Sequence, residues 1–292
     1  MKGVILSSGF GKRLWPVTEV SPKVVHPIYN KPSIYYSLAF LIQQGVTEIG
    51  IVGTDESNNL IRGLFNDGCD LGCKIKYLNE AKKYVRGTAT SLACAEDFVQ
   101  KEPFILLLGD SLFIDKEAGC LGKLFNQVMK ARSTSFNLLM PVYDARQYAY
   151  FDKEKAVEKG NREGITQAIS GLYFFQPSVF QYLKKIKQSE RGEYELVSVI
   201  NLMMQDHYFE TLGPFDHVIW TDTGVPELLY AATSLIRQIE LLTGRLIGSP
   251  HYEAYKKGLV NKTMLVNQFQ GKNSSYAEGV RRMLPELKWR TT

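Results

Sequence analysis

The chain has 292 residues, of which 45% are hydrophobic and 22% charged, so disordered and fibrous proteins are excluded. The formal net charge of +5 suits a small anionic substrate and falls short of the basic surface that nucleic acid requires. The apolar runs are far shorter than the roughly 20 residues that span a bilayer. We therefore expect no membrane helix, no signal peptide and a cytoplasmic location. The length fits one large α/β domain or two smaller domains.

The four cysteines are too few, in a chain of this length, for a disulfide framework. Cys69 and Cys73 are spaced like two residues on one helix face, but Gly68 and Gly72 favour a turn there. Because no second Cys/His pair lies nearby in the sequence, we expect no zinc site.

The first half of the chain alternates short apolar runs with helical patterns. Strands are predicted at residues 4–6, 48–52, 74–78, 104–108 and 135–142, and helices at 33–44, 58–65, 88–99 and 121–131. Continuous apolar strands separated by helices indicate a mostly parallel sheet that is covered on both faces. Such sheets bind ligands at the carboxyl ends of their strands, so we expect the functional site there.

The second half of the chain begins with a charged stretch, residues 144–164, that we interpret as irregular. Strands are then predicted at 170–175 and 217–220, and helices at 179–186, 196–205 and 226–242. The tail from Gly248 is expected to form short helices. Because neither an internal repeat nor a flexible linker divides the chain, we predict an α/β core at residues 1–242 and a C-terminal helical segment at 243–292.

A glycine-containing turn follows the first predicted strand, in the sequence LSSGFGKRL from Leu6 to Leu14. Glycines at positions 9 and 11 let backbone N–H groups approach a phosphate, and the basic pair at 12 and 13 adds positive charge. The turn matches neither the Walker A pattern nor the complete dinucleotide fingerprint. Taken alone, it is either a phosphate loop or simply a tight turn.

Three charged residues have both a functional and an ordinary interpretation. Lys23, in a loop stiffened by prolines, is either an anion ligand or a solvated surface lysine. Asp110 ends a strongly apolar run, which places its carboxylate at a strand end where it could supply half of a magnesium site. Asp222 follows a strand and precedes a helix, so it is either a second metal ligand or an N-cap. The acidic residues at 193 and 195 are interpreted as helix-dipole complements.

The order of these motifs resembles that of the sugar-1-phosphate nucleotidylyltransferase family, in particular the glucose-1-phosphate thymidylyltransferases. Residues 27–36, PIYNKPSIYY, are similar to the family's PIYDKPMIYY, and residues 249–258, SPHYEAYKKG, resemble its C-terminal segment. The resemblance covers nearly the whole chain. It implies a Rossmann-like, mostly parallel mixed sheet flanked by helices, of the nucleotide-diphospho-sugar transferase type, with a C-terminal helical appendage.

The resemblance also implies a role for each candidate residue. The nucleotide would be bound by Leu6, Ser8, Gly9, Gly11, Lys12, Arg13 and, against the base, Gly87. The catalytic residues would be Arg13, Lys23 and Lys159, the first two balancing charge on the departing pyrophosphate. The sugar phosphate would be bound by Glu158, Lys159 and Gly171, and Mg²⁺ by Asp110 and Asp222. The basic residues among them would concentrate the excess positive charge of the chain around the phosphates of the two substrates.

The chain departs from the family pattern at several positions. In the glycine loop, Ser7, Ser8 and Lys12 replace Ala, Gly and Thr, and Val24 stands where thymidylyltransferases carry Gln. On the sugar side, the segment from 148 to 159 is shorter, and Ala149, Gly160 and Ser198 replace Gly, Pro and Asp, respectively. The departures therefore cluster on the sugar side, whereas the candidate metal carboxylates and leaving-group cations are kept.

The sequence therefore predicts a Mg²⁺-dependent nucleotidylyltransferase that joins a nucleoside triphosphate, with dTTP favoured, to a sugar-1-phosphate, with glucose-1-phosphate favoured. The alternatives are a UTP- or CTP-using enzyme and a catalytically weak homologue that binds nucleotide sugars. A dinucleotide-binding dehydrogenase is disfavoured because the glycine loop lacks its third glycine and the acidic partner about 20 residues on. The resemblance further implies a homo-oligomer, a dimer or a tetramer.

Overall fold

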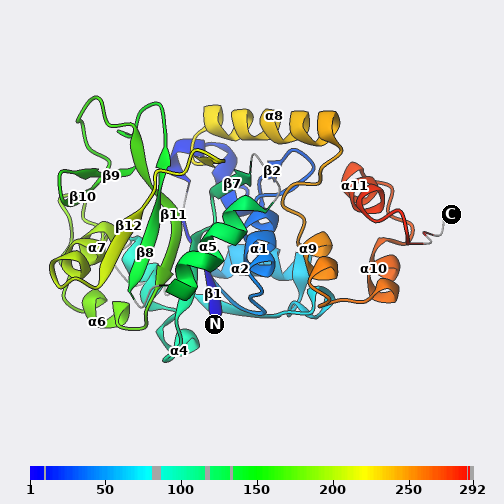
Figure 1. Cartoon of the computed structure of the whole chain (residues 1–292), viewed down its shortest axis with the longest axis horizontal. Coiled ribbons are helices and arrows are strands. Elements are labelled where there is room, and N and C mark those ends of the chain that lie inside the picture. The colour runs from blue at the N-terminus through cyan, green and yellow to red at the C-terminus, as the bar shows by residue number, and fades with distance from the viewer. Residues whose placement is uncertain (10, 81–86, 116–118, 132–133, 288, 290–292) are drawn as a thin grey trace.

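The central feature of the protein is a seven-stranded mixed sheet (Figure 1). The computed structural model describes residues 1–9, 11–80, 87–115, 119–131, 134–287 and 289. The strands, in sheet order, are β12 (Phe209–Leu212), β8 (Ser135–Pro141), β11 (Gln167–Phe175), β6 (Phe104–Leu108), β1 (Lys2–Leu6), β4 (Glu48–Gly53) and β5 (Lys74–Asn79). β11 alone among them runs antiparallel to both neighbours. The predicted mostly parallel mixed sheet is thus confirmed.

Helices cover both faces of this sheet because its strands are apolar on both sides. In β6, for example, Ile105 and Leu107 pack into one core cluster while Phe104 and Leu106 pack into the other. The first cluster is closed by α1 (Ile34–Gln43), α2 (Asp55–Phe65), α5 (Cys120–Ala131) and α9 (Pro250–Lys256). The second is closed by α3 (Thr88–Ala93), α4 (Glu96–Val99), α6 (Val179–Leu183) and α7 (Leu196–Gln205).

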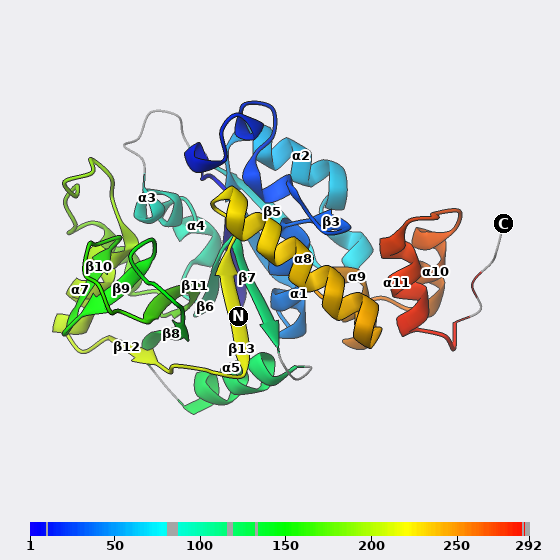
Figure 2. The same ribbon diagram turned by 90° about the horizontal axis from the view of Figure 1, so that it is seen from above.

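Three short antiparallel pairs surround the end of the sheet where β1 and β6 terminate. They are β2 (Pro27–Ile28) with β3 (Lys31–Pro32), β7 (Ser111–Asp115) with β13 (Val218–Asp222), and β9 (Ala149–Asp152) with β10 (Lys155–Glu158). The long helix α8 (Pro226–Thr243) contacts β13 and β2 and lies lengthwise across the molecule in Figure 2. The pairs thus enclose the strand ends on several sides.

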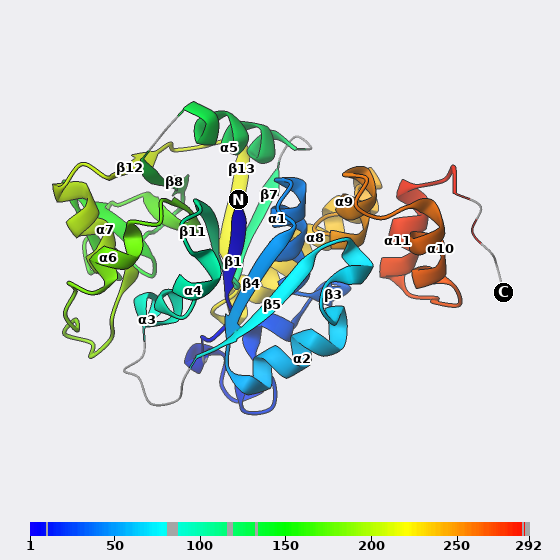
Figure 3. The same cartoon turned by 90° about the horizontal axis from the view of Figure 1, so that it is seen from below.

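The C-terminal part of the chain forms short helices, as expected. α10 (Lys262–Phe269) and α11 (Ser275–Met283) share a small apolar cluster and lie at the end of the molecule opposite α6 and α7 (Figure 3). By contrast, Ala254 of α9 and the following Val260 belong to the main core cluster. The division of the chain at residues 242 and 243 stays a prediction. In the described ranges, no helix has the length and apolar character needed to cross a membrane.

Two predictions of secondary structure were wrong. Residues 144–164 are not irregular, because they contain the hairpin of β9 and β10, whose alternate residues Tyr150 and Ala156 are buried. The helix predicted at 88–99 is two helices, α3 and α4. Between them, the backbone N–H groups of Cys94 and Ala95 donate to carbonyl oxygens three residues back, as in a 3₁₀ turn. The turn predicted near Cys69 is confirmed, as both flanking glycines have left-handed backbones.

Candidate active site

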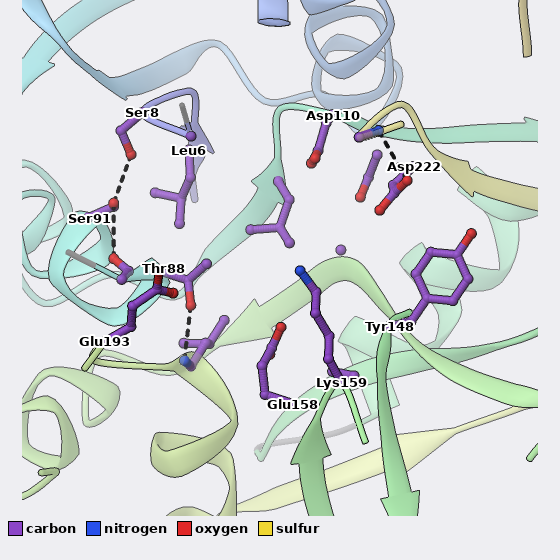
Figure 4. Close-up of a pocket in the computed structure, with 18 of the residues that line it drawn as sticks. Leu6, Ser8, Thr88, Ser91, Asp110, Tyr148, Glu158, Lys159, Glu193 and Asp222 are labelled. Atoms are coloured by element: carbon purple, nitrogen blue, oxygen red, sulfur yellow. Dashed lines mark hydrogen bonds between the residues drawn. The ribbon is translucent and has the colours of Figure 1, made fainter. Parts of the chain in front are cut away.

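A cavity of about 470 Å³ opens where β1 and β6 end, between the main sheet and the β9–β10 hairpin. Every site residue predicted from the sequence lines it, from Leu6 at the end of β1 to Asp222 at the end of β13. Figure 4 shows Asp110, Asp222 and Tyr148 on one side of this cavity, Ser8, Ser91 and Thr88 on the other, and Glu158 and Lys159 reaching in between. The cavity lies at the strand ends, where the sequence placed it.

The glycine turn wraps around Lys23. A Cβ on Gly9 would lie 2.9 Å from Cε of Lys23, and Gly11 has a φ of 58°, a left-handed conformation that favours glycine. Directly after Gly11, a 3₁₀ turn over Lys12–Leu14 carries Arg13 toward the cavity while Leu14 is buried. The two glycines thus permit a tight turn that brings three cations to one wall.

Asp110 forms an ion pair with Lys23. The Lys23 ammonium donates to Oδ2 of Asp110, and the two side chains are only 16% and 15% exposed. Burial alone would raise the pKa of the Asp110 carboxyl, but the ammonium of Lys23 outweighs this effect and holds that pKa below its usual range. Lys23 is therefore the largely covered partner of a carboxylate and not a solvated surface lysine.

Asp222 does not cap the helix that follows it. α8 has Val225 at its N-cap, whereas Oδ1 of Asp222 accepts a hydrogen bond from the backbone N–H of Gly224 at 3.1 Å. Its Oδ2 lies 3.8 Å from the guanidinium of Arg13. Burial, together with the nearby carboxylate of Asp110, raises the pKa of Asp222. The carboxylate therefore belongs to the cavity.

The two aspartates fit the requirements of a divalent cation. Asp110 and Asp222 face the same space, since β7 and β13 pair Ser111 with Asp222. The mutual repulsion that contributes to the raised pKa of Asp222 is what a cation would relieve. Among the described residues there is no cluster of three or more potential protein ligands. Two carboxylates suit Mg²⁺, which usually takes one or two of them and completes its shell with water and substrate phosphates.

Glu158 and Lys159 reach the cavity from the end of the β9–β10 hairpin. Lys159 has a φ of 50°, so the chain bends sharply there, and Figure 4 shows its ammonium pointing into the cavity. Burial raises the pKa of Glu158, although the charge of Lys159 opposes this effect. The side chains at the hairpin end thus offer one cation and one hydrogen-bonding carboxyl to a ligand.

Two glycines shape the walls. A Cβ on Gly171 would lie 2.0 Å from Oγ of Ser111, and one on Gly87 would lie 2.0 Å from the carbonyl oxygen of Tyr194. Gly171 sits where the register between β11 and β8 shifts, which makes room for β7 beside it. Both positions therefore need glycine for close approach of neighbouring chain segments.

The structure adds residues that the sequence did not predict in this site. Arg191 lines the cavity and lies 3.3 Å from Glu195, 3.7 Å from Glu193 and 3.8 Å from Glu158. Glu195 is the N-cap residue of α7, which agrees with the interpretation of an acid at the helix N-terminus, whereas Glu193 lies before the helix. Further lining residues are Glu80, Thr88, Ser91, Ser111, Gln147, Tyr148 and Trp220.

This fold and site define an α/β protein with a cavity at its strand ends that basic side chains line and that contains a pair of carboxylates suited to a metal. The chain belongs to the nucleotidyl transferase family, whose model matches residues 2–239, and it is accordingly a nucleotidyltransferase.

Named relatives agree with this assignment. The chain is 32% identical over 257 residues to the low-salt glycan biosynthesis nucleotidyltransferase Agl11 of Haloferax volcanii, covering 84% of this chain and 68% of that protein. It is 30% identical over 272 residues to a glucose-1-phosphate thymidylyltransferase of Mycolicibacterium smegmatis, covering 92% and 93%. The crystal structure of a UDP-glucose pyrophosphorylase with UDP-glucose has a TM-score of 0.71 at 20% identity, covers 81% and 98%, and supports the fold alone. The family resemblance noted in the sequence is confirmed.

Proposed function

We propose that this enzyme joins a nucleoside triphosphate to a sugar-1-phosphate. A phosphate oxygen of the sugar-1-phosphate attacks the α-phosphorus of the triphosphate, the bond from that phosphorus to the bridging oxygen of the β-phosphate breaks, and pyrophosphate leaves. The observation that carries the proposal is one cavity with cations at two places, Arg13 and Lys23 beside the two aspartates and Lys159 after the β9–β10 hairpin. Two phosphorylated substrates would need this arrangement.

The glycine turn and its cations would bind the triphosphate. The backbone around Gly9 and Gly11 can approach phosphate oxygens, and Arg13 and Lys23 would balance the charge that develops on the departing pyrophosphate. The attacking oxygen is already part of an ionised phosphate, so positioning and charge balance matter more than a protein acid or base. Lys23 would exchange part of its contact with Asp110 for the phosphates.

Asp110 and Asp222 would hold Mg²⁺, which when bound neutralises phosphate charge and polarises the α-phosphoryl group. This assignment is supported by two neighbouring carboxylates, each of which has one basic side chain beside it: Lys23 lies beside Asp110, and Arg13 lies beside Asp222. Arg13 and Lys23 would keep the two carboxylates apart and oriented before the substrate arrives.

The sugar-1-phosphate would lie against the β9–β10 hairpin. Lys159 would bind its phosphate, Glu158 would accept hydrogen bonds from sugar hydroxyls, and the backbone of Gly171, which lines the cavity, would lie against the sugar. Arg191, whose guanidinium lies 3.8 Å from the carboxylate of Glu158, would help to hold Glu158 in place.

The name of the relative that is 30% identical makes dTTP and glucose-1-phosphate the first substrate pair to test, with UTP and CTP as alternative nucleotides. A homo-oligomer, dimer or tetramer, and a cytoplasmic location stay predictions of the family resemblance.

The proposal is tested by mixing the protein and Mg²⁺ with a panel of triphosphates and sugar-1-phosphates and measuring pyrophosphate release. We expect release that needs both substrates. Thermal unfolding in the presence of nucleotide sugar separates the alternative, because a binding homologue would be stabilised by the ligand yet release no pyrophosphate.

A further inference from the structure

One side of the cavity ends in a short hydrogen-bonded chain of side chains. Oγ of Ser8, just after β1, lies 2.8 Å from Oγ of Ser91 in α3, and Oγ of Ser91 lies 3.0 Å from Oε1 of Glu80. Oγ of Ser91 is also 3.2 Å from the carbonyl oxygen of Gly87. All four residues line the cavity. This chain is separate from the carboxylate pair at Asp110, which lies across the cavity from Ser8 and Ser91 (Figure 4).

The direction of these hydrogen bonds follows from the groups involved. A glutamate carboxylate and a backbone carbonyl can only accept, so Ser91 directs its single hydroxyl proton toward Glu80 at 3.0 Å and Gly87 at 3.2 Å, and Ser8 then donates to Ser91. The backbone N–H of Glu80 donates to the carbonyl oxygen of Gly53 at 2.9 Å, which anchors the residue at the end of β5. Glu80 is therefore oriented from two sides, with one carboxylate oxygen engaged by Ser91.

The position of the Glu80 carboxylate indicates which part of the substrates it would contact. This inference rests on the function proposed above. If the phosphates occupy the wall around Asp110 and the sugar lies against Lys159, the space left along the cavity is that beside Ser8 and Ser91 (Figure 4). Glu80 lines this space through its contact with Ser91. The base of the triphosphate is the remaining part of the substrates, so its hydrogen-bonding edge would face Glu80.

We propose that Glu80 selects a base with amino and ring N–H donors on its Watson–Crick edge, guanine above all. Guanine presents two neighbouring N–H donors, which match the two oxygens of a carboxylate in a bidentate, charge-assisted pair. Thymine and uracil present one N–H between two carbonyl oxygens, and those oxygens would face the carboxylate without a donor. Glu80 thus favours a nucleotide other than the one in the thymidylyltransferase relative's name.

The test compares GTP with dTTP in the wild-type enzyme and in Glu80→Gln, by kcat/KM with glucose-1-phosphate and by calorimetric binding with Mg²⁺. In the wild type we expect GTP to exceed dTTP by about tenfold or more, the discrimination typical of one bidentate base contact. Glu80→Gln should shift this ratio toward dTTP, since an amide can both donate and accept. Ser91→Ala should shift the ratio in the same direction by less, and the exposed Glu56→Gln in α2 should leave it unchanged.

The outcomes separate this inference from the proposed function. Turnover that prefers dTTP, or a ratio that Glu80→Gln leaves unchanged, would overturn the role of Glu80 while the proposed function stands. Glu80-dependent preference for GTP in binding, without pyrophosphate release from any triphosphate, would support the role of Glu80 and overturn the proposed function.

Discussion

At the scale of single residues, the site depends on two aspartates with different surroundings. Asp110 is hydrogen-bonded to the ammonium of Lys23, whereas Asp222 lies 3.8 Å from the guanidinium of Arg13. The pKa of Asp110 is lowered from its usual value, and that of Asp222 is raised. This asymmetry indicates that Asp222 gains more from an added cation than Asp110 does, because its charge is less well compensated in the protein alone.

Replacing either aspartate by asparagine should remove most turnover while the fold is retained. Asp110→Asn and Asp222→Asn each keep the size of the side chain but lose a negative charge that would hold Mg²⁺. The bound ion would stabilise the transition state by several kcal/mol. We expect pyrophosphate release to fall about 100-fold or more. The exposed Asp97→Asn in α4 is the matched control and should keep the wild-type rate. Near-normal rates in either site variant would show that the metal assignment is wrong.

Lys159→Ala should weaken the binding of the sugar-1-phosphate and leave that of the nucleotide nearly unchanged. A charged hydrogen bond contributes about 1.5–3 kcal/mol, so the KM for sugar-1-phosphate should rise about tenfold or more. Steady-state kinetics with each substrate varied in turn measures this difference. Lys155→Ala, exposed on the same hairpin, is the control. A larger change in the KM for the triphosphate would contradict this role, because it would show that Lys159 binds the nucleotide and not the sugar-1-phosphate.

How far single residues could be predicted from sequence depended on their local pattern. Asp110 follows an apolar strand, and strand ends meet at one edge of a parallel sheet, so its place in the cavity was predictable. Glu80 also follows a strand, β5, but that strand alternates apolar with polar residues and so marks its end less clearly. Arg191 carries no such signal, and it reaches the cavity through its tertiary contact with Glu158.

At the scale of elements, strands with continuous apolar runs were predicted well and the hairpin of β9 and β10 was not. Phe104–Leu108 matches its prediction at both ends, because every residue but the last is fully buried. In the hairpin only one face of each strand is buried, and Lys153, at its turn, has a φ of 56° without being glycine. Charged residues on the exposed face concealed the alternation.

The contact of β11 with β7 gives a prediction about Gly171. A Cβ there would lie 2.0 Å from Oγ of Ser111 and 3.0 Å from Cβ of Leu108, so Gly171→Ala should destabilise the protein by about 1–3 kcal/mol. Gly63→Ala in α2, where a Cβ has nothing within 4 Å, should instead stabilise it by about 0.4–1 kcal/mol. Urea unfolding measures both changes. If Gly171→Ala were as stable as the wild type, the close packing of β11 on β7 would be incorrect.

At the scale of the whole molecule, the C-terminal helices are joined to the core through a buried polar cluster. Nδ1 of His251 lies 2.8 Å from the hydroxyl of Tyr276, whose oxygen is 2.7 Å from Oγ of Ser249. The ring of Tyr35, in α1, packs edge-on against that of Tyr276 with centroids 5.5 Å apart. α9, α11 and α1 therefore meet at one place, which links the stability of the tail to that of the sheet.

This cluster predicts a pH dependence of stability. Burial, with a smaller contribution from Lys272, lowers the pKa of His251 to about 4. The unfolded chain protonates this histidine near pH 6.5, so between these values it binds more protons than the folded chain. The free energy of unfolding should thus fall as the pH drops from 6.5 to 4, by about 3 kcal/mol from this residue. Unfolding at a series of pH values measures it.

His251→Gln should reduce that pH dependence, whereas the exposed His217→Gln should keep it. The comparison between the variants isolates His251 from the carboxylates that titrate in the same range. Equal slopes of unfolding free energy against pH for wild type and His251→Gln would contradict the buried, uncharged histidine.

The same unfolding experiments test the predicted division of the chain. A separate, earlier unfolding transition for residues 243–292 would support that division, and one common transition would oppose it.

The central claim, that this chain transfers a nucleotidyl group to a sugar-1-phosphate, is tested most directly by identifying the products. The enzyme is incubated with Mg²⁺, glucose-1-phosphate and each of GTP, CTP, ATP, UTP and dTTP, and pyrophosphate and nucleotide sugar are quantified by mass spectrometry. We predict that the two products form in equal amounts with at least one triphosphate, and that neither forms with Asp222→Asn. Pyrophosphate without nucleotide sugar, or no product across a wider panel of sugar-1-phosphates, would contradict the claim.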